Sequence, residues 1–200
     1  MSAARFALRD YVPADAAGVV RFWVQAWNAT GILPIDFALR GEWLAGHLAA
    51  LAETGVHVIV AEVSGGPDDF PCPLPGRRGV CASRLCGLMT IDPRTGELDQ
   101  LCVALGVQGT DLARHLLNEA KNRAPGRIEL KVNVDNPRAR RFYEREGFAV
   151  CERGISDISG LPFLGLRWAP KPKRGQALAG ATLGRSASAP VSNCSRAKRA

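Results

Sequence analysis

Two neighbouring stretches decide the fold: ELDQLCVALGVQGTDLARHLLNEAK, residues 97–121, and RIELKVNVDNPRARRFYEREGF, residues 127–148. In the first stretch, residues 98–104 are predicted to form a strand and residues 105–110 a loop. The loop opens directly into a helix, predicted over 111–124 from the helical spacing of its apolar residues. In the second stretch, the alternation over 127–134 predicts another strand. A short helix is then predicted to start at Asn136-Pro137 and to end at Gly147.

The loop at 105–110 has the features of an anion site. The first turn of a helix leaves backbone N–H groups without partners, and the helix dipole makes this end positive. Gly109 permits close approach of a ligand to the backbone, and Thr110 is a natural N-cap. Such a turn suits a pyrophosphate. Plain helix capping without a ligand is the alternative explanation of the same residues.

The order of these motifs resembles the GNAT superfamily of acetyl-CoA-dependent N-acetyltransferases. The resemblance is carried by the strand before the turn, by the turn, by an Asn-x-x-Ala-x-x-Phe-Tyr motif and by a Gly-Phe pair. The matching residues are Leu101, Cys102, Val103, the turn 108–113, Asn136, Ala139, Phe142, Tyr143, Gly147 and Phe148. The turn pattern of the family is Gln/Arg-x-x-Gly-x-Gly/Ala. In this chain, Asp111 stands where the family has the middle glycine.

The resemblance implies an α/β (α+β) fold. Its centre is a mixed, mostly antiparallel sheet of about six to seven strands, flanked by about four helices and splayed at the acetyl-CoA site. We expect this domain to span residues 1–170, with 64–79 as a surface loop insertion that four prolines and four glycines keep irregular. Residues 171–200 are rich in Lys, Arg, Ala, Gly and Ser and are predicted to form a disordered basic tail.

The remaining elements are predicted from apolar periodicity. Strands are expected at 5–10, 56–63, 85–92, 148–155 and 161–168, and the turn at 92–96 should pair the strand at 85–92 antiparallel with the one that follows. A helix starting at 13–15 carries an apolar stripe that includes Trp23 and Trp27; the sharper alternative places Trp27 and Asn28 at the mouth of an acceptor pocket. A second helix is expected from 36 to about 54, with His47 on its inward face in a structural role.

The resemblance also assigns roles to particular residues. The backbone of Leu101, Cys102 and Val103 would bind the pantetheine arm and polarise the thioester carbonyl. The residues expected to wrap the pyrophosphate are Gln108, Gly109, Thr110, Asp111, Leu112, Ala113 and Arg114. Asn136 would contact the CoA arm. Tyr143 would be the general acid for the departing thiolate, because a phenol of pKa about 10 can protonate a thiolate whose thiol has a pKa of about 8.5. A core aromatic is the alternative for Tyr143.

Two carboxylates are candidates for the general base. By strand alternation, Glu97 and Asp99 project from one face, and either could take the amine proton directly or through a water. Asp99 is preferred because it lies closer to the presumed reaction centre. Both could instead be solvated charges at the edge of the sheet.

Asp111 conflicts with a bound pyrophosphate. Two unit charges about 5 Å apart repel by roughly 0.8 kcal/mol in water and about 3 kcal/mol at an effective dielectric constant of 20. Exchange of Asp111 for Gly is therefore expected to tighten acetyl-CoA binding. The alternative is a carboxylate that stabilises the first helical turn while facing solvent.

Composition limits the other classes of function. Residues 158–200 hold eight Lys and Arg and no Asp or Glu, whereas residues 1–157 hold 18 basic and 19 acidic side chains, so the basic character belongs to the tail. This argues against a specific nucleic-acid-binding face on the folded part. No apolar run of about 18 residues predicts a membrane span, and no leader is recognised, which favours a cytoplasmic protein. The six cysteines include no Cys-x-x-Cys pair, so reduced thiols and no metal are expected.

The leading hypothesis is thus an N-acetyltransferase that uses acetyl-CoA as cosubstrate and an amine of a small molecule or protein as acceptor. The alternative is a degenerate domain of the same kind that serves as a CoA-binding or protein-interaction module without catalysis. A third hypothesis is nucleic-acid binding through the tail. The sequence identifies no particular acceptor and leaves open whether the chain forms a homodimer.

Overall fold

The computed structural model describes residues 6–32, 36–63, 84–157 and 159–170. Within these ranges the chain forms seven strands, four α-helices and three short 3₁₀ helices. All strand pairs in the two sheets are antiparallel, which confirms the predicted α/β (α+β) class with a mostly antiparallel sheet. The first compact unit of the chain ends at Ala169. The predicted insertion at 64–79 and the predicted tail at 171–200 lie outside the described residues.

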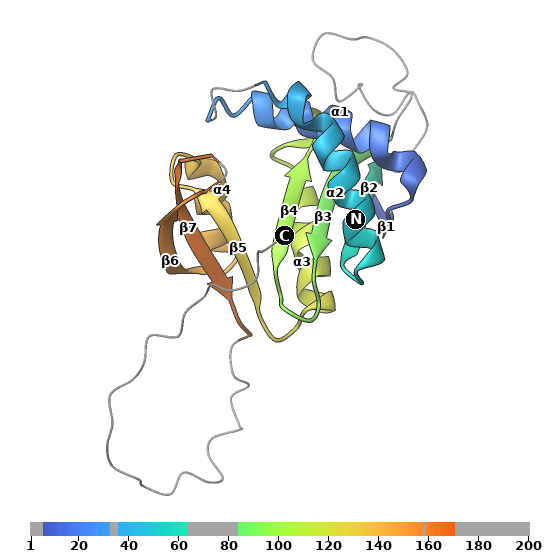
Figure 1. Ribbon diagram of the computed structural model, residues 1–200. Helices are drawn as coiled ribbons and strands as arrows, with labels where there is room; N and C mark the ends of the chain where they lie inside the picture. Colours follow the sequence, from blue (N-terminus) through green and yellow to red (C-terminus); the bar gives the residue numbers. More distant parts are fainter. Residues whose placement is uncertain (1–5, 33–35, 64–83, 158, 171–200) are drawn as a thin grey trace, which may run out of the picture. The chain divides into compact units, whose positions relative to one another are not determined.

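The first sheet has four strands in the order β1-β2-β3-β4 (Figure 1). Their bounds are Phe6–Asp10 for β1, His57–Val63 for β2, Leu85–Ile91 for β3 and Leu98–Val103 for β4. The hairpin predicted at 92–96 joins β3 to β4 and is closed by a hydrogen bond from Asp92 N to Glu97 O of 3.0 Å. Every residue of β3 is buried, as expected for a strand covered by helices on both faces.

Three helices cover this sheet. The 3₁₀ turn Pro13–Asp15 leads into α1, Ala16–Asn28; the 3₁₀ turn Phe37–Arg40 leads into α2, Gly41–Glu53; and α3 spans Leu112–Arg123. Figure 1 shows α2 in front of the sheet and α3 behind β3 and β4. The continuous helix predicted over 36–54 is wrong in its first turn, which is 3₁₀. The break falls at Gly41, where an added Cβ would lie 2.9 Å from Val20 of α1, so the two helices approach closely there.

The second sheet has three strands in the order β5-β7-β6, namely Ile128–Asn133, Pro162–Trp168 and Ala149–Ile155. Helix α4, Pro137–Arg145, connects β5 to β6. Asn136 caps α4 as predicted, its side-chain oxygen accepting a hydrogen bond of 3.0 Å from the Ala139 N–H. Side chains from both sheets, such as Leu88 of β3 and Leu130 of β5, belong to one hydrophobic core.

The two sheets are joined beside Gly96. Glu97 forms a parallel bridge to Glu129 of β5, and the Glu129 N–H donates to Gly96 O at 2.8 Å. From this junction β4 and β5 diverge (Figure 1). Gly96 has a φ of 77°, and a Cβ there would lie 2.4 Å from the Arg127 carbonyl oxygen. The junction therefore requires glycine at this position.

Replacing Gly96 with alanine is expected to lower the free energy of unfolding by about 2 kcal/mol or more, because a positive φ and a backbone clash coincide. Chemical denaturation followed by circular dichroism measures the change. Gly126→Ala is the matched control, since its φ is not in the left-handed region and an added Cβ there meets nothing within 4 Å. Equal stability of the two variants would contradict the proposed strain.

Candidate active site

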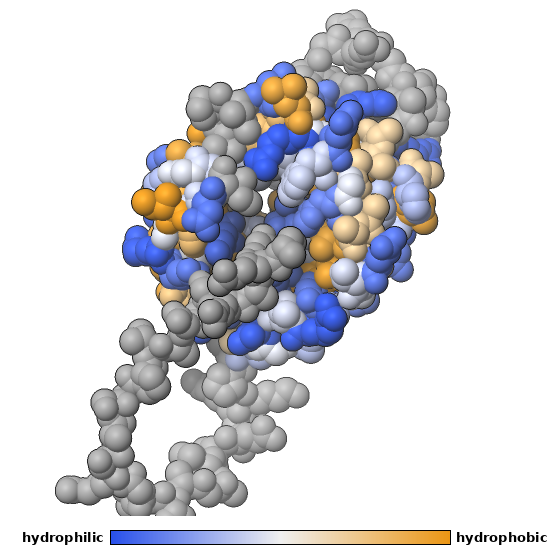
Figure 2. Space-filling view, in the orientation of Figure 1, coloured by the Kyte–Doolittle hydropathy of each residue, from blue (hydrophilic) through white to orange (hydrophobic). Residues whose placement is uncertain are grey.

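The space between the diverging strands is a cleft of about 940 Å³, near the upper end of the range for small-molecule sites. Side chains from β4, from the turn before α3, from β5, from α4 and from the end of α1 line it. In the orientation of Figure 1, the coloured residues on either side of the region between the two sheets are mostly hydrophilic (Figure 2). Polar groups therefore converge on an open cavity.

The edge of β4 presents backbone groups to this cleft. Ala104 N–H donates to Cys86 O at 2.8 Å, and Cys102 is paired with Leu88 in the same register. Since N–H groups alternate between the two edges of a strand, those of Leu101 and Val103 point away from β3. Both residues line the cleft. Of the three residues predicted to bind the pantetheine arm, Leu101 and Val103 thus offer main-chain donors, whereas Cys102 offers its side chain.

The turn before α3 lies at one end of the cleft. Gly109 has a φ of 85°, and the position of a Cβ there meets nothing within 4 Å, so this glycine keeps the backbone bare. The predicted N-cap at Thr110 is wrong by one residue: Asp111 occupies the N-cap position and makes no side-chain capping bond. The Thr110 hydroxyl instead donates to Val107 O at 2.6 Å and accepts from Leu112 N at 3.4 Å.

Most of the turn residues predicted to wrap a pyrophosphate do line the cleft. They are Gln108, Gly109, Thr110, Asp111, Ala113 and Arg114, whereas Leu112 is fully buried in the core. The Asp111 carboxylate forms an ion pair of 2.9 Å with Arg114, and both side chains are more than half exposed. The negative charge that the sequence places in this turn is therefore paired with a cation one helical turn away.

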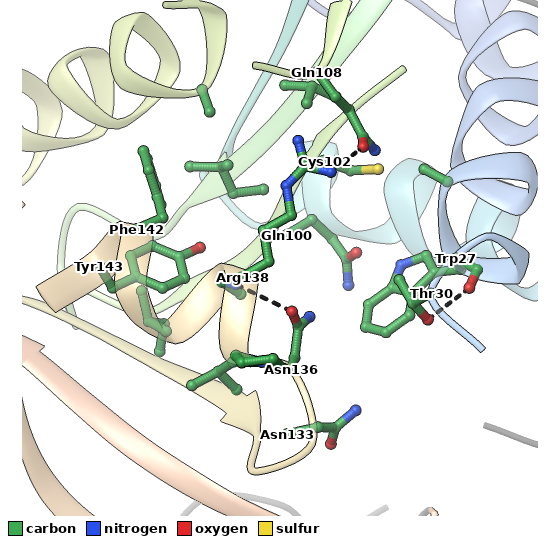
Figure 3. Close-up of a pocket in the computed structure, with 18 of the residues that line it drawn as sticks. Trp27, Thr30, Gln100, Cys102, Gln108, Asn133, Asn136, Arg138, Phe142 and Tyr143 are labelled. Carbon is green, nitrogen blue, oxygen red and sulfur yellow. Dashed lines mark hydrogen bonds between the residues drawn. The ribbon is translucent and has the colours of Figure 1, made fainter. Parts of the chain in front are cut away.

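A second cation faces the turn from the opposite wall. Arg138, in the first turn of α4, donates to the Gln108 side-chain oxygen across the cleft (Figure 3). Asn136, predicted to contact the CoA arm, also lines the cleft beside Arg138. Arg138 was not predicted as a site residue, because only the fold brings it opposite a residue 30 positions earlier.

Tyr143 lies in the wall formed by α4. Its ring makes edge-to-face contacts with Phe142 and Phe148, and only 8% of the residue is exposed. The hydroxyl points into the cleft, toward the wall that carries Cys102 (Figure 3). Burial, with a smaller effect of Cys102, raises the pKa of Tyr143 above its ordinary value, so the phenol is protonated at neutral pH. Burial also raises the pKa of the Cys102 thiol, to about 12.

The two candidate bases are placed differently. Asp99 lines the cleft, whereas Glu97 is exposed at the junction of the sheets and does not. A β-bulge in strand β4 lies between the two residues. Ile91 of β3 is opposite Leu98 and Thr90 is opposite Gln100, so Asp99 has no partner residue in the register. Bulges interrupt strand alternation and often re-aim side chains beside active sites. The simple alternation used to place both carboxylates on one face does not allow for this.

Asp99 has a neighbour that the sequence did not predict. His47 Nε2 of α2 lies 2.6 Å from Asp99 Oδ2, and Gln100 Nε2 lies 3.4 Å from the same oxygen. The expectation that His47 faces inward is wrong, because its side chain is partly exposed and paired with a cleft carboxylate, while its structural role stays a prediction. The two residues are 52 positions apart, and no local motif signals the contact.

The segment that contains most of the cleft residues resembles a known protein family. Residues 80–168 match the family model described as an acetyltransferase (GNAT) domain. This part of the chain is similar to the GNAT acetyltransferase domain. No curated protein matches the sequence of the chain.

Solved structures share the GNAT fold with this chain. YncA from Salmonella typhimurium, determined with acetyl-CoA, has a TM-score of 0.60 and 15% identity, covering 88% of this chain and 100% of its own. The PaiA N-acetyltransferase from Thermoplasma acidophilum, in complex with coenzyme A, has a TM-score of 0.59 and 18% identity, with coverages of 85% and 100%. The spermidine N-acetyltransferase from Vibrio cholerae, with CoA and spermine, has a TM-score of 0.57 and 17% identity, with coverages of 82% and 95%.

Two kinds of feature are absent from the described residues 6–32, 36–63, 84–157 and 159–170. None of the helices there combines the length and apolar character needed to cross a bilayer. No three His, Cys, Asp or Glu side chains in these ranges are grouped as ligands of a metal ion would be.

Proposed function

We propose that this protein is an N-acetyltransferase that transfers the acetyl group of acetyl-CoA to a primary amine. The observation that carries the proposal is the pair of facing walls in one cleft. One wall presents the outward N–H groups of β4 and the bare turn at Gly109; the other presents the protonated Tyr143 hydroxyl. Acyl transfer to an amine needs a held carrier, a polarised carbonyl, a base and an acid, and these groups can supply each of them.

The residues fit acetyl-CoA in three respects. The main-chain N–H groups of Leu101 and Val103 can bind the carbonyls of an extended pantetheine arm as a partner strand would. The start of α3, with Gly109 before it, can receive a pyrophosphate, and Arg138 and Arg114 add positive charge beside it. When bound, acetyl-CoA supplies the thioester that the amine attacks.

Tyr143 and Asp99 are the proposed acid and base. Asp99 takes the proton from the amine, and the Tyr143 hydroxyl protonates the departing sulfur. We prefer Asp99 to Glu97 because Asp99 alone of the two lines the cleft.

A direct test combines binding and turnover on the full chain. Isothermal calorimetry measures the affinity of the protein for CoA and acetyl-CoA. Thiol release and mass spectrometry of the products measure acetyl transfer to a panel of primary amines. We expect micromolar binding, as a rough scale for such carriers, and an N-acetylated product. No binding of either carrier would overturn the proposal.

Asp111 supports the second candidate, a domain that binds CoA or a protein partner without catalysis. Its carboxylate stands in the turn where phosphates would lie. Binding of acetyl-CoA without transfer to any amine would favour this candidate.

Replacing Asp111 with asparagine is expected to tighten acetyl-CoA binding about fivefold. The change removes a repulsion of about 1 kcal/mol for an exposed charge near the phosphates and releases Arg114 toward them. Asparagine keeps the size of the side chain and adds no backbone freedom, which makes it a cleaner test than glycine. Calorimetry at low and high salt measures the change, and screening should shrink it at high salt. An affinity that is unchanged at both salt concentrations would show that Asp111 faces away from the phosphates.

A further inference from the structure

The α1 side of the cleft differs in character from the rest of its lining. The residues contributed there by the end of α1 and the segment after it carry no charge: Ala26, Trp27, Ala29, Thr30 and Ile32. Strand β4 lines the cleft with Leu98, Asp99, Gln100, Leu101, Cys102 and Val103, so Asp99 is the only carboxylate that β4 and the described residues of the α1 side contribute. The charged lining residues of the other walls come from the turn, the first turn of α3, β5 and α4 with the residues that flank it: Asp111, Arg114, Lys131, Asp135, Arg138, Arg145 and Glu146.

Trp27 provides a flat apolar surface at this side of the cleft. Its ring stacks on Phe37, with centroids 5.1 Å apart and an interplanar angle of 14°, which fixes the orientation of the indole. The Trp23 ring contacts both rings of the pair: its centroid lies 6.1 Å from that of Trp27 and 5.3 Å from that of Phe37. Figure 3 shows the Trp27 ring on the wall opposite Asn136, with Gln100 between them. A rigid indole held from behind is a platform on which a planar group can stack.

Asp99 is oriented by two helices at once. From α2, His47 Nε2 lies 2.6 Å from Asp99 Oδ2. From α1, the Trp23 indole N–H donates to Gln100 Oε1 at 3.0 Å, and this leaves the Gln100 amide nitrogen aimed at the same Oδ2 at 3.4 Å. Because a carboxylate accepts, the hydrogen in the His47 contact is on Nε2.

His47 is itself held in place by stacking. Its ring lies parallel to Trp43, with centroids 4.9 Å apart and an interplanar angle of 11°, and the Arg40 guanidinium lies 5.1 Å from the Trp43 ring centroid. Trp43 remains 44% exposed. Its stacking fixes the orientation of the imidazole that faces Asp99.

We infer that this side of the cleft is the acceptor site for a primary monoamine with a flat apolar body, in which Asp99, positioned by His47, receives the ammonium group and Trp27 stacks on the body. The inference rests on the proposed function and names its substrate class. A polyamine would bring two or more cations to a wall where the described residues offer one carboxylate. His47 is a positioning residue, because it acts through Asp99.

The substrate class is tested with three amines on the full chain: 2-phenylethylamine, ethylamine and spermidine. We expect kcat/KM for 2-phenylethylamine to exceed that for spermidine by roughly tenfold or more. Trp27→Ala should raise KM for 2-phenylethylamine about tenfold and leave that for ethylamine, which has no body to stack, within about twofold. Trp27→Phe should restore most of the loss. A preference for spermidine, or an equal effect of Trp27→Ala on both monoamines, would overturn the inference.

The positioning role is tested with two variants of His47. His47→Ala should lower kcat roughly tenfold with little change in KM, since the loss of a hydrogen bond to a charged group is felt in proton transfer. His47→Gln, which returns an N–H donor near the place of Nε2, should recover much of that loss. His115→Ala is the matched control, an exposed histidine on α3 outside the cleft lining. In a protein that already carries Asp99→Asn, His47→Ala should not lower kcat further. An additive loss of kcat in the double variant would contradict the inference that His47 acts through Asp99.

Failure of the inference and failure of the proposed function give different results. If acetyl-CoA binds and neither these three amines nor any other amine of the panel is acetylated, the enzymatic proposal fails. The acceptor site is then tested by calorimetry of the three amines against the CoA-bound protein. Binding of 2-phenylethylamine that Trp27→Ala weakens would support the site, and absence of binding would overturn it.

Discussion

Replacing Tyr143 with phenylalanine is expected to lower kcat roughly 100-fold or more while leaving the affinity for acetyl-CoA within about twofold. The ring contacts with Phe142 and Phe148 do not involve the hydroxyl, so phenylalanine keeps the packing of this nearly buried residue. In the proposed mechanism, the variant lacks the proton donor to the departing sulfur. Steady-state kinetics, calorimetry and a thermal melt separate these quantities.

The raised pKa of Tyr143 does not disqualify it as an acid. Burial raises the pKa of the Cys102 thiol in the same cleft to about 12, and a thiolate released into that environment would be similarly basic. The donor and the leaving group are therefore shifted in the same direction, which preserves the match between them. It also follows that the alkaline limb of the kcat profile should not begin at the ordinary tyrosine pKa of about 10. A kcat that Tyr143→Phe leaves unchanged would contradict the acid role.

Replacing Asp99 with asparagine is expected to lower kcat/KM roughly 100-fold at pH 7. The loss should shrink about tenfold for each unit of rising pH, because an amine of pKa about 10.4 then arrives increasingly deprotonated and needs no base. Measurement of kcat/KM from pH 7 to pH 9 for wild type and variant gives this ratio directly.

Glu97→Gln is the control for the assignment of the base. Glu97 is exposed beside the bridge to Glu129 and lies outside the cleft lining, so kcat/KM should stay within about twofold of wild type. If Glu97→Gln carried the large, pH-dependent loss and Asp99→Asn did not, the two residues would exchange roles.

Local sequence rules predicted the elements that local physics determines. Asn136 followed by Pro137 marked the start of α4, and the turn at 92–96 gave the antiparallel pairing of β3 with β4. The turn around Gly109 was recognised because its glycine and the following helix are adjacent in the chain. Each of these features depends on a few consecutive residues, and the type of each side chain determines the backbone conformation that the residue prefers.

The site residues that were misplaced depend on distant partners or on small irregularities. His47 shares an apolar stripe with Leu44 and Leu48, so periodicity places it inward, but Asp99 and Trp43 hold it at the cleft. The bulge at Asp99 breaks the alternation that grouped it with Glu97. The shift of the α3 N-cap from Thr110 to Asp111 reflects a hydroxyl already engaged by Val107. Periodicity reports which face is apolar, and it does not report which neighbour arrives from another element.

The outward N–H groups of Leu101 and Val103 have a consequence for how such proteins can diverge. If a carrier binds through main-chain N–H groups, its affinity depends little on the side chains of the same residues, provided that these favour an extended strand. Substitutions could then accumulate along this edge from lineage to lineage without loss of the grip. Structures with 15–18% identity to this chain share its fold, so the shape of the backbone tolerates wide change in the side chains.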